Sequence, residues 1–291
     1  MKRIPNFTEL RAGKVGYDTR YQIDTDHPLY NDPLVDPREP EFGFYDASSY
    51  YSKPNNMTGE ILPGVPDAPL VRLNIAKRLT LADIFLRSDP DVREALGGPV
   101  HIRIDDALRP YQVQKFAFEI AWPMVIKRLN PEMTDKEVAE QVPNYCAKPN
   151  AKLTPTPHLT GGAVDVSLIN LKTGEPLDRG HTGGSVKGTA YPDFHEGYHL
   201  IDGQSDIVNS EDQAKVQPEG SIVVLGRRIL YYAMTEIAGL YVNPQEIWHY
   251  GKGDPLSEYV SGSNHPYYGV AELPEWYQEE MARLQTTQSL V

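Results

Sequence analysis

The chain has 291 residues, 40% of them hydrophobic and 23% charged, which is an ordinary balance for a globular protein of one large domain or two small ones. Its net charge of -12 disfavours nucleic acid and anionic membrane surfaces as partners, because both are negatively charged. The one cysteine, Cys146, excludes an internal disulfide, and we interpret it as a small buried residue.

The first part of the chain has little periodic pattern. Residues 1–30 are polar and carry no apolar stretch of signal-peptide length, and no segment is apolar enough over its length to span a membrane, so we expect a cytoplasmic protein. Residues 1–68 are rich in Pro, Asp, Asn and Tyr. They are predicted to form an irregular segment, with a strand or two, that wraps a single domain of residues 69–291.

Caps, breakers and apolar spacing predict the regular elements from Val71 onward. In chain order they are a helix over 80–87 capped by Thr80, a short helix from Pro90 to Gly97, a strand over 100–106, a helix after Pro110 with a kink at Pro123, a short helix capped by Thr134, a strand over 163–169, a helix over 221–240, an extended run over 246–250 and a terminal helix near 274–284.

One stretch of sequence pairs a histidine with an aspartate. His158 and Asp165 are seven residues apart, and Gly161 and Gly162 lie between them. The glycines permit a tight turn, so that His158 in a loop folds back toward Asp165 on the strand. An aspartate in a strand or a histidine in a loop commonly serves only as a hydrogen-bonding residue, so a metal site needs a further ligand from elsewhere in the chain.

A later motif supplies that ligand. Glu246-Ile247-Trp248-His249 holds a histidine with a carboxylate three residues before it, although Glu-x-x-His alone is a weak signal. Two imidazoles and one carboxylate leave the fourth tetrahedral position of zinc open for water, as catalytic zinc requires. A nearby carboxylate that is not a ligand can take the proton of that water.

These motifs resemble the zinc D-alanyl-D-alanine dipeptidase family, which includes the vancomycin-resistance dipeptidases. The family carries Ser-x-His-x-x-Gly-x-Ala-x-Asp and a later Glu-x-x-His, and the spacing within both motifs matches here. Upstream, Asp105 to Pro110 is similar to the family's Asp-Ala-Tyr-Arg-Pro, and Asn56-Met57-Thr58-Gly59 is similar to its Asn-Phe-Thr-Gly. The matches run in family order from about residue 55 to residue 250.

The resemblance implies a role for each matched residue. His158, Asp165 and His249 would bind one zinc ion, and Glu246 would be the general base. Arg109 would stabilise the oxyanion or anchor the substrate, because a guanidinium is always charged and donates in a rigid fork. The alternative for Arg109 is a structural ion pair with a neighbouring aspartate.

The sequence also departs from the family pattern. Thr156 stands where the family has Ser, and the basic residue before the motif glycine is absent. The stretch from Asp178 to Pro218 is longer, and it should contain the carboxylate that binds the ammonium group of the dipeptide. Asp193 is the best counterpart of that carboxylate, so Thr156 and Asp193 are the predicted substrate-binding residues.

A rival metal motif lies in this longer stretch. His195-Glu196-Gly197-Tyr198-His199 spells His-Glu-x-x-His, which binds zinc only on a helix, where residues four apart share a face. Pro192 precedes the motif, Gly197 lies inside it and no long amphipathic helix surrounds it. We interpret it as a polar rim loop.

The predicted fold is α+β, an antiparallel sheet with helices on one side and the zinc site on the exposed face, as in the D-Ala-D-Ala peptidase/hedgehog-like zinc fold. The predicted activity is hydrolysis of D-alanyl-D-alanine-type dipeptides, which makes a small dipeptide the expected partner. Two alternatives stay open: a zinc D,D- or L,D-carboxypeptidase or endopeptidase acting on peptidoglycan stem peptides, and a non-catalytic zinc-binding or ligand-binding module. The sequence does not indicate an oligomeric state.

Overall fold

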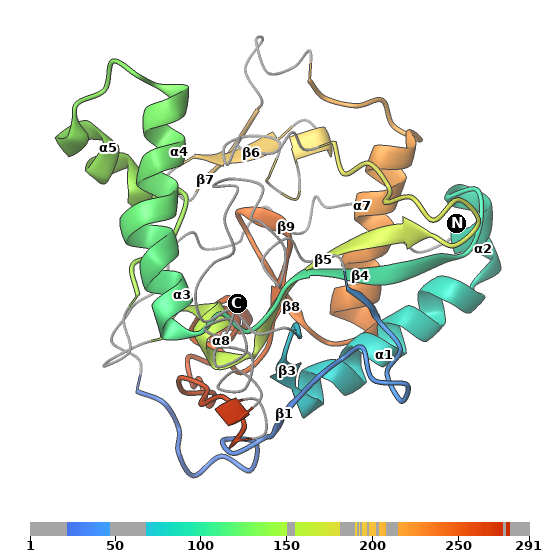
Figure 1. Ribbon diagram of the computed structural model, residues 1–291. Coiled ribbons are helices and arrows are strands. Elements are labelled where there is room, and N and C mark those ends of the chain that lie inside the picture. Colours follow the sequence, from blue (N-terminus) through green and yellow to red (C-terminus); the bar gives the residue numbers. More distant parts are fainter. Residues whose placement is uncertain are drawn as a thin grey trace, which may run out of the picture.

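The computed structural model describes residues 22–46, 68–149, 155–180, 190, 192, 194–196, 198–201, 204–207, 215–275 and 278–279 (Figure 1). Its elements, in chain order, are β1 (Leu34–Val35), β2 (Tyr45–Asp46), β3 (Val71–Arg72), α1 (Leu73–Ser88), α2 (Pro90–Ala95), β4 (Val100–Asp106), α3 (Tyr111–Phe116), η2 (Ala117–Ala121), α4 (Trp122–Leu129), α5 (Asp135–Gln141), η3 (Val142–Asn144), η4 (Pro157–Thr160), β5 (Ala163–Asn170), η5 (Phe194–Glu196), β6 (Tyr198–Ile201), β7 (Gln204–Ile207), α7 (Ile222–Tyr232), η6 (Ala233–Ile237), β8 (Tyr241–Asn243), β9 (Glu246–Gly251) and α8 (Pro255–Ser261).

A five-stranded sheet, in the order β2-β4-β5-β9-β8, forms the centre of the described part of the chain. The pairs β4–β5, β5–β9 and β8–β9 are antiparallel, whereas the edge strand β2 runs parallel to β4. The predicted α+β class is therefore confirmed, with one correction: a wholly antiparallel sheet was wrong at its β2 edge. Strand β2 joins β4 from a distant part of the sequence, so no local pattern indicates the direction of this pair.

Helices α1 and α7 cover one face of this sheet (Figure 1). Alternate residues of β4 and β5 enter the core with Ile75 and Leu79 of α1 and Ile229 of α7. The long helix of α3, η2 and α4 stands on the other side of the molecule in Figure 1. The opposite face of the sheet therefore receives the other residues of each strand, including Asp165, because successive strand side chains alternate.

Some predicted elements were displaced. Helix α1 begins at Leu73, so the cap predicted at Thr80 was wrong: Thr80 lies inside the helix, where its hydroxyl donates to the carbonyl of Ala76 at 3.0 Å. The cap at Thr134 is confirmed as a full capping box with Glu137. At the predicted kink, a π-helical turn immediately precedes the helical turn that contains Pro123.

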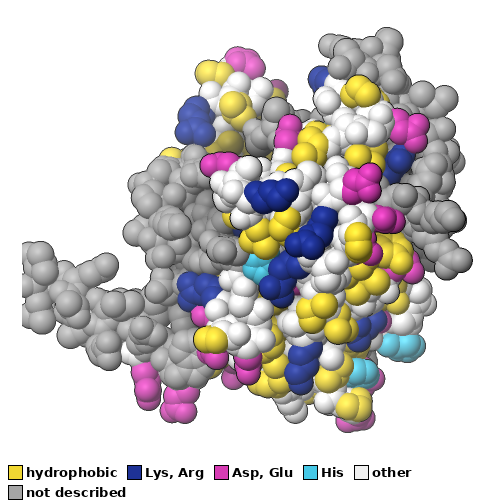
Figure 2. Space-filling view, turned by 90° about the vertical axis from the view of Figure 1, so that its right-hand side faces the viewer, with side chains coloured by type: hydrophobic (Ala, Val, Ile, Leu, Met, Phe, Trp, Pro, Cys, Tyr) yellow, Lys and Arg dark blue, Asp and Glu magenta, His cyan; other side chains and the backbone are white. Residues whose placement is uncertain are grey.

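The described surface carries both signs of charge. On the side of the molecule with α2 and α7, Lys and Arg side chains run through the middle of the view, with Asp and Glu around them (Figure 2). The acidic excess of the sequence is therefore not gathered on this face. Among the described residues, none of the helices combines the length and the apolar character that crossing a bilayer requires.

His195 ties together the two ends of the longer stretch from Asp178 to Pro218. Its Nδ1 accepts from the backbone N–H of Gln217 at 3.2 Å, and its Nε2 lies 3.2 Å from the carbonyl oxygen of Gly180. Because a carbonyl only accepts, Nε2 carries the proton and the ring is neutral. Burial, and then the positive charge of Arg227, lower the pKa of His195 to about 4.

This pKa makes stability depend on pH over a defined range. The unfolded chain protonates His195 near its ordinary pKa of about 6.5, whereas the folded chain resists protonation until about pH 4, so stability is lost as pH falls between these values. We expect His195→Gln, which keeps a donor and an acceptor but does not titrate, to lose less stability as the pH falls. The urea unfolding midpoints of the wild type and the variant at pH 7.5, 5.5 and 4.5 measure this difference. Midpoints that fall in parallel with pH in both proteins would contradict the prediction.

Candidate metal centre

Three side chains converge on the face of the sheet opposite α1 and α7. His158 comes from η4, Asp165 from β5 and His249 from β9. One ligand atom from each residue lies within 4.8 Å of the others, and both histidines are buried while Asp165 is partly buried. This His-Asp-His cluster can hold a metal ion, and the structure thus brings together the three residues that the sequence predicted as ligands.

The register of the sheet places two of these residues side by side. Asp165 on β5 lies directly opposite His249 on β9, so both side chains point to the same face. Nδ1 of His249 lies 2.9 Å from Oδ1 of Asp165. On the other neighbouring strand, an irregularity between Ile104 and Asp106 places Asp106, rather than Asp105, opposite Asp165. A row of three polar residues therefore crosses β4, β5 and β9.

His158 reaches this row from a turn. Gly161 adopts a φ of +70°, which L-residues with side chains rarely adopt, and so reverses the chain between η4 and β5. Arg72 fixes the turn, because its Nε donates to the carbonyl of Thr160 at 2.8 Å and its backbone N–H donates to that of Gly161 at 2.9 Å. The backbone N–H of Arg109 donates to the carbonyl of His158 at 3.0 Å.

The hydrogen bonding of His158 leaves the correct nitrogen for a metal. Its Nδ1 lies 2.8 Å from the carbonyl oxygen of Ala107, so Nδ1 carries the proton of the neutral ring. Nε2, which lies 3.4 Å from Oδ1 of Asp165, then presents a lone pair. A backbone carbonyl on the distal nitrogen is the usual way in which proteins fix the tautomer of a metal-binding histidine.

Oδ1 of Asp165 tests whether the cluster fits a cation. The atom is buried and has no hydrogen bond, although one nitrogen of each histidine lies 2.9 Å and 3.4 Å away. The three groups therefore converge without the alignment of hydrogen bonds. A buried carboxylate oxygen that meets its neighbours by charge alone, without an aligned hydrogen bond, is only partly satisfied. A divalent cation held by Nε2 of His158, Nδ1 of His249 and this oxygen would satisfy it, so the donor set fits.

The three groups alter one another's protonation. Burial acts to raise the pKa of the Asp165 carboxyl, but the neighbouring histidines outweigh it and hold that pKa well below its usual range. Burial acts to lower the pKa of His249, but the Asp165 carboxylate outweighs it and raises that pKa to about 9. At neutral pH without a metal, His249 therefore carries a proton that a cation would displace.

Glu246 lies beside the cluster without belonging to it. Its Oε2 lies 3.8 Å from Nδ1 of His249 and accepts a hydrogen bond from Nδ2 of Asn243 at 2.9 Å. The two residues stand opposite each other where β8 turns into β9. Burial raises the pKa of the Glu246 carboxyl, and His249 partly opposes this effect. The arrangement fixes a carboxylate beside the cluster.

Arg109 points its guanidinium toward two fixed partners. Its Nη2 forms a short ion pair with Oδ2 of Asp106, and its Nη1 donates to Oε1 of Gln114 at 2.7 Å. The ion pair considered from the sequence is therefore present, through Asp106, while Asp105 pairs with Arg103 and Arg179. An ion pair does not exclude a catalytic role, because a guanidinium has five N–H donors.

The predicted substrate-binding residues have different outcomes. Thr156 lies two residues before His158, and its hydroxyl is buried without a hydrogen-bond partner among the described residues. Asp193 and the motif Asn56 to Gly59 lie outside the described residues. Sequence reasoning missed Asn243 and Gln114, since single amides form no recognisable motif. The Asn243-Pro244 pair, a turn signal just before Glu246, is the one local hint for Asn243.

The rival motif does not lie on an α-helix. His195 belongs to η5, whereas His199 belongs to strand β6. Residues four apart share a face only on an α-helix, so the zincin geometry is absent from this part of the described chain. Both ring nitrogens of His195 also have backbone partners, as described above.

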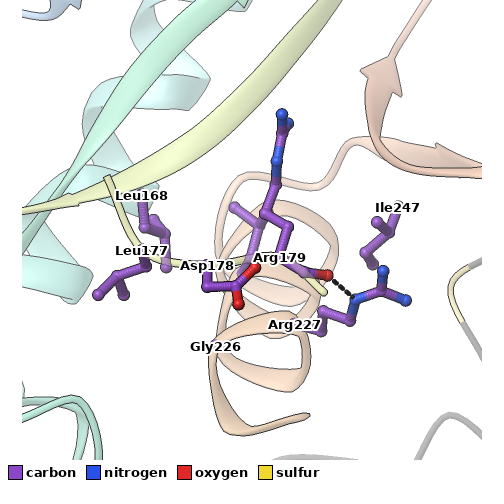
Figure 3. A pocket seen from close by; sticks show the side chains of 8 residues that line it. Leu168, Leu177, Asp178, Arg179, Gly226, Arg227 and Ile247 are labelled. Atoms are coloured by element: carbon purple, nitrogen blue, oxygen red, sulfur yellow. Dashed lines mark hydrogen bonds between the residues drawn. The ribbon is translucent and has the colours of Figure 1, made fainter. Parts of the chain in front are cut away.

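A separate pocket lies between α7 and the segment 177–179, which follows β5 (Figure 3). Nε of Arg227 donates to the carbonyl oxygen of Arg179 at 2.7 Å across one wall. The lining residues are Leu168, Leu177, Asp178, Arg179, Gly226, Arg227, Leu230 and Ile247. The pocket contains none of the three candidate ligands, so it is distinct from the cluster.

Comparisons with known proteins bear on the family of the chain. No family model matches the chain. A D-alanyl-D-alanine dipeptidase of Synechocystis sp. (strain ATCC 27184 / PCC 6803 / Kazusa) is 31% identical over 217 residues, which cover 70% of this chain and 77% of that protein. On this similarity, the chain belongs to the D-alanyl-D-alanine dipeptidase family.

Proposed function

We propose that the protein hydrolyses D-alanyl-D-alanine-type dipeptides with a zinc ion held by His158, Asp165 and His249. The convergence of these three residues is the observation that carries the proposal, because family membership alone leaves the site undefined. Its fold would then be the D-Ala-D-Ala peptidase/hedgehog-like zinc fold. A small dipeptide is the proposed substrate.

The donor set favours zinc. Two imidazole nitrogens and one carboxylate oxygen form the usual protein ligands of catalytic zinc, although the same set accepts other divalent ions. Such an ion, when bound, would lower the pKa of a coordinated water and polarise a carbonyl oxygen.

Glu246 is the proposed general base and acid. Water adds its oxygen to the scissile carbonyl carbon and gives one proton to the Glu246 carboxylate. The carbon–nitrogen bond then breaks, and Glu246 returns that proton to the nitrogen of the leaving D-alanine. Two features support this role: the hydrogen bond from Asn243, which orients the carboxylate, and burial, which raises its pKa toward the range in which a base both accepts and returns a proton.

Arg109 is proposed to bind the substrate oxygen that becomes negative as water adds. Its guanidinium is held near the row of Asp106, Asp165 and His249, and a fixed donor needs no rearrangement as charge develops. Thr156 is proposed to contact the substrate, which would supply a partner for its buried hydroxyl. Asp193 is proposed to bind the substrate ammonium group on the strength of the family pattern.

The direct test is D-alanine release from D-Ala-D-Ala by the zinc-loaded protein. We expect Glu246→Gln, which can still accept from Asn243, to reduce kcat at least about a hundredfold, because general acid–base catalysis contributes on that scale. His195→Gln serves as a control and should retain the wild-type rate. Loss of activity in the His195 variant alone would return the metal to the rival motif. Activity only on longer stem peptides would indicate a carboxypeptidase or endopeptidase.

Metal binding should be coupled to proton release. Because the pKa of His249 is about 9 without a metal, the ring is protonated at pH 7, and zinc must displace that proton. Zinc affinity should therefore rise by about tenfold per pH unit up to about pH 9, with about one proton released per zinc at pH 7. Calorimetric titration of the metal-free protein in two buffers of different ionisation enthalpy measures this. Equal apparent enthalpies in both buffers would contradict it.

His249→Ala provides the matching removal of a ligand. We expect it to lower zinc content and dipeptidase activity together, whereas Glu246→Gln lowers activity and keeps the zinc, because Glu246 lies outside the cluster. Metal analysis after dialysis, beside the activity assay, separates the two. Full zinc content in His249→Ala would overturn the proposed ligand set, and zinc binding with no activity on any D-amino-acid peptide would favour a non-catalytic module.

A further inference from the structure

Gln114 is a buried amide whose position follows directly from the chain around Arg109. It lies on α3, which begins after Pro110, and its backbone N–H donates to the Pro110 carbonyl at 3.0 Å. The residue is 1% exposed. A buried amide must satisfy both of its ends, because each unpaired polar atom costs free energy.

The contacts of Gln114 fix which way its amide faces. Nε2 donates to the carbonyl oxygen of Ala147 at 2.7 Å and lies 3.3 Å from Sγ of Cys146. Because the Ala147 carbonyl only accepts, the NH2 group must face it, and Oε1 must face Nη1 of Arg109. Rotating the amide by half a turn would set two acceptors against each other at Ala147 and two donors at Arg109.

Arg109 is thus held at both terminal nitrogens of its guanidinium, Nη1 and Nη2. Asp106 pairs with Nη2, and Asp106 is itself 2% exposed and fixed by accepting from the backbone N–H of Ala107 at 2.9 Å. Gln114 accepts from Nη1. Two partners at different nitrogens set the plane of the guanidinium.

The chemistry of the second partner also matters. An amide oxygen orients the guanidinium without adding negative charge, whereas a second carboxylate would offset the positive charge of Arg109 and repel the Asp165 and Glu246 carboxylates nearby. A neutral acceptor therefore keeps the guanidinium fixed and its charge available for a developing oxyanion.

We propose that Gln114 is a positioning residue, which joins the segment at Ala147 to Arg109 and so sets the orientation in which Arg109 meets the substrate. This inference rests on the proposed role of Arg109 and deepens it, since it names what holds the arginine in place. Gln114 acts through Arg109 and does not itself touch the reacting atoms.

The variant Gln114→Met tests this, because methionine fills a similar volume without either hydrogen bond. The matched control is Asn74→Leu, which removes an amide oxygen that accepts from Nε of Arg78 at 2.7 Å on α1, away from the cluster. Thermal unfolding of both variants reports any general loss of structure.

The first readout does not depend on activity. Nitrogen-15 NMR of the full-length, zinc-loaded protein measures rotation of the Arg109 guanidinium, with the signals assigned by their loss in Arg109→Lys. We expect this rotation to be at least about tenfold faster in Gln114→Met, since a hydrogen bond to a charged group is worth roughly that factor. The rate should be unchanged in Asn74→Leu. An unchanged rate in Gln114→Met would overturn the proposal.

The second readout is a double-mutant cycle with D-Ala-D-Ala. Gln114→Met should lower kcat about tenfold with little change in KM, and it should cause no further loss in the Arg109→Ala background, because it acts only through the arginine. Equal losses in both backgrounds would show a merely structural role. If the wild-type protein hydrolyses no dipeptide, the proposed function fails and the rotation rate alone decides the role of Gln114. The rotation rate likewise decides the role of Gln114 when the activity of Arg109→Ala is too low to measure.

Discussion

The register between β5 and β9 is the constraint on which the candidate site depends. It sets Val164 opposite Tyr250 in the core and Asp165 opposite His249 on the other face. A slip of one residue would bury the Asp165 carboxylate against α1 and α7 and expose the apolar set, since strand side chains alternate. The burial of apolar residues on one face therefore holds the candidate ligands in place on the other.

The polar face of the sheet carries many charges, and most of them have partners. Asp105 pairs with Arg103 and Arg179, and Asp106 pairs with Arg109. Buried charges are costly unless they are paired, so these pairs allow several carboxylates to lie close together. Oδ1 of Asp165 is different, because it is buried without a hydrogen bond. The His-Asp-His cluster, where charges meet without aligned hydrogen bonds, is the part of the face suited to a cation.

The sequence predicted the elements whose signals are local. The alternation in 100–106 and 163–169 located β4 and β5 to within a residue, because each strand has one buried face. The start of α1 was misplaced since Thr80 carries a cap-like pattern that the structure uses inside the helix. Helix α8 was overlooked, although Asp254 caps it and Pro255 opens it. The parallel pairing of β2 and the contact of Gln114 with Ala147 join distant segments, so neither contact can be predicted from a local sequence pattern.

The two-glycine turn before β5 has a consequence for the order of events during folding. A Cβ at Gly161 would lie 2.8 Å from Leu34, and a Cβ at Gly162 would lie 2.7 Å from Tyr268, so segments from both ends of the described chain press on this turn. Contacts of such long sequence separation form only after large loops close, and closure of this kind slows folding. We therefore expect the nascent chain to bring the His-Asp-His cluster together late, after residue 268 has been synthesised and docked, rather than when His158 and Asp165 first emerge.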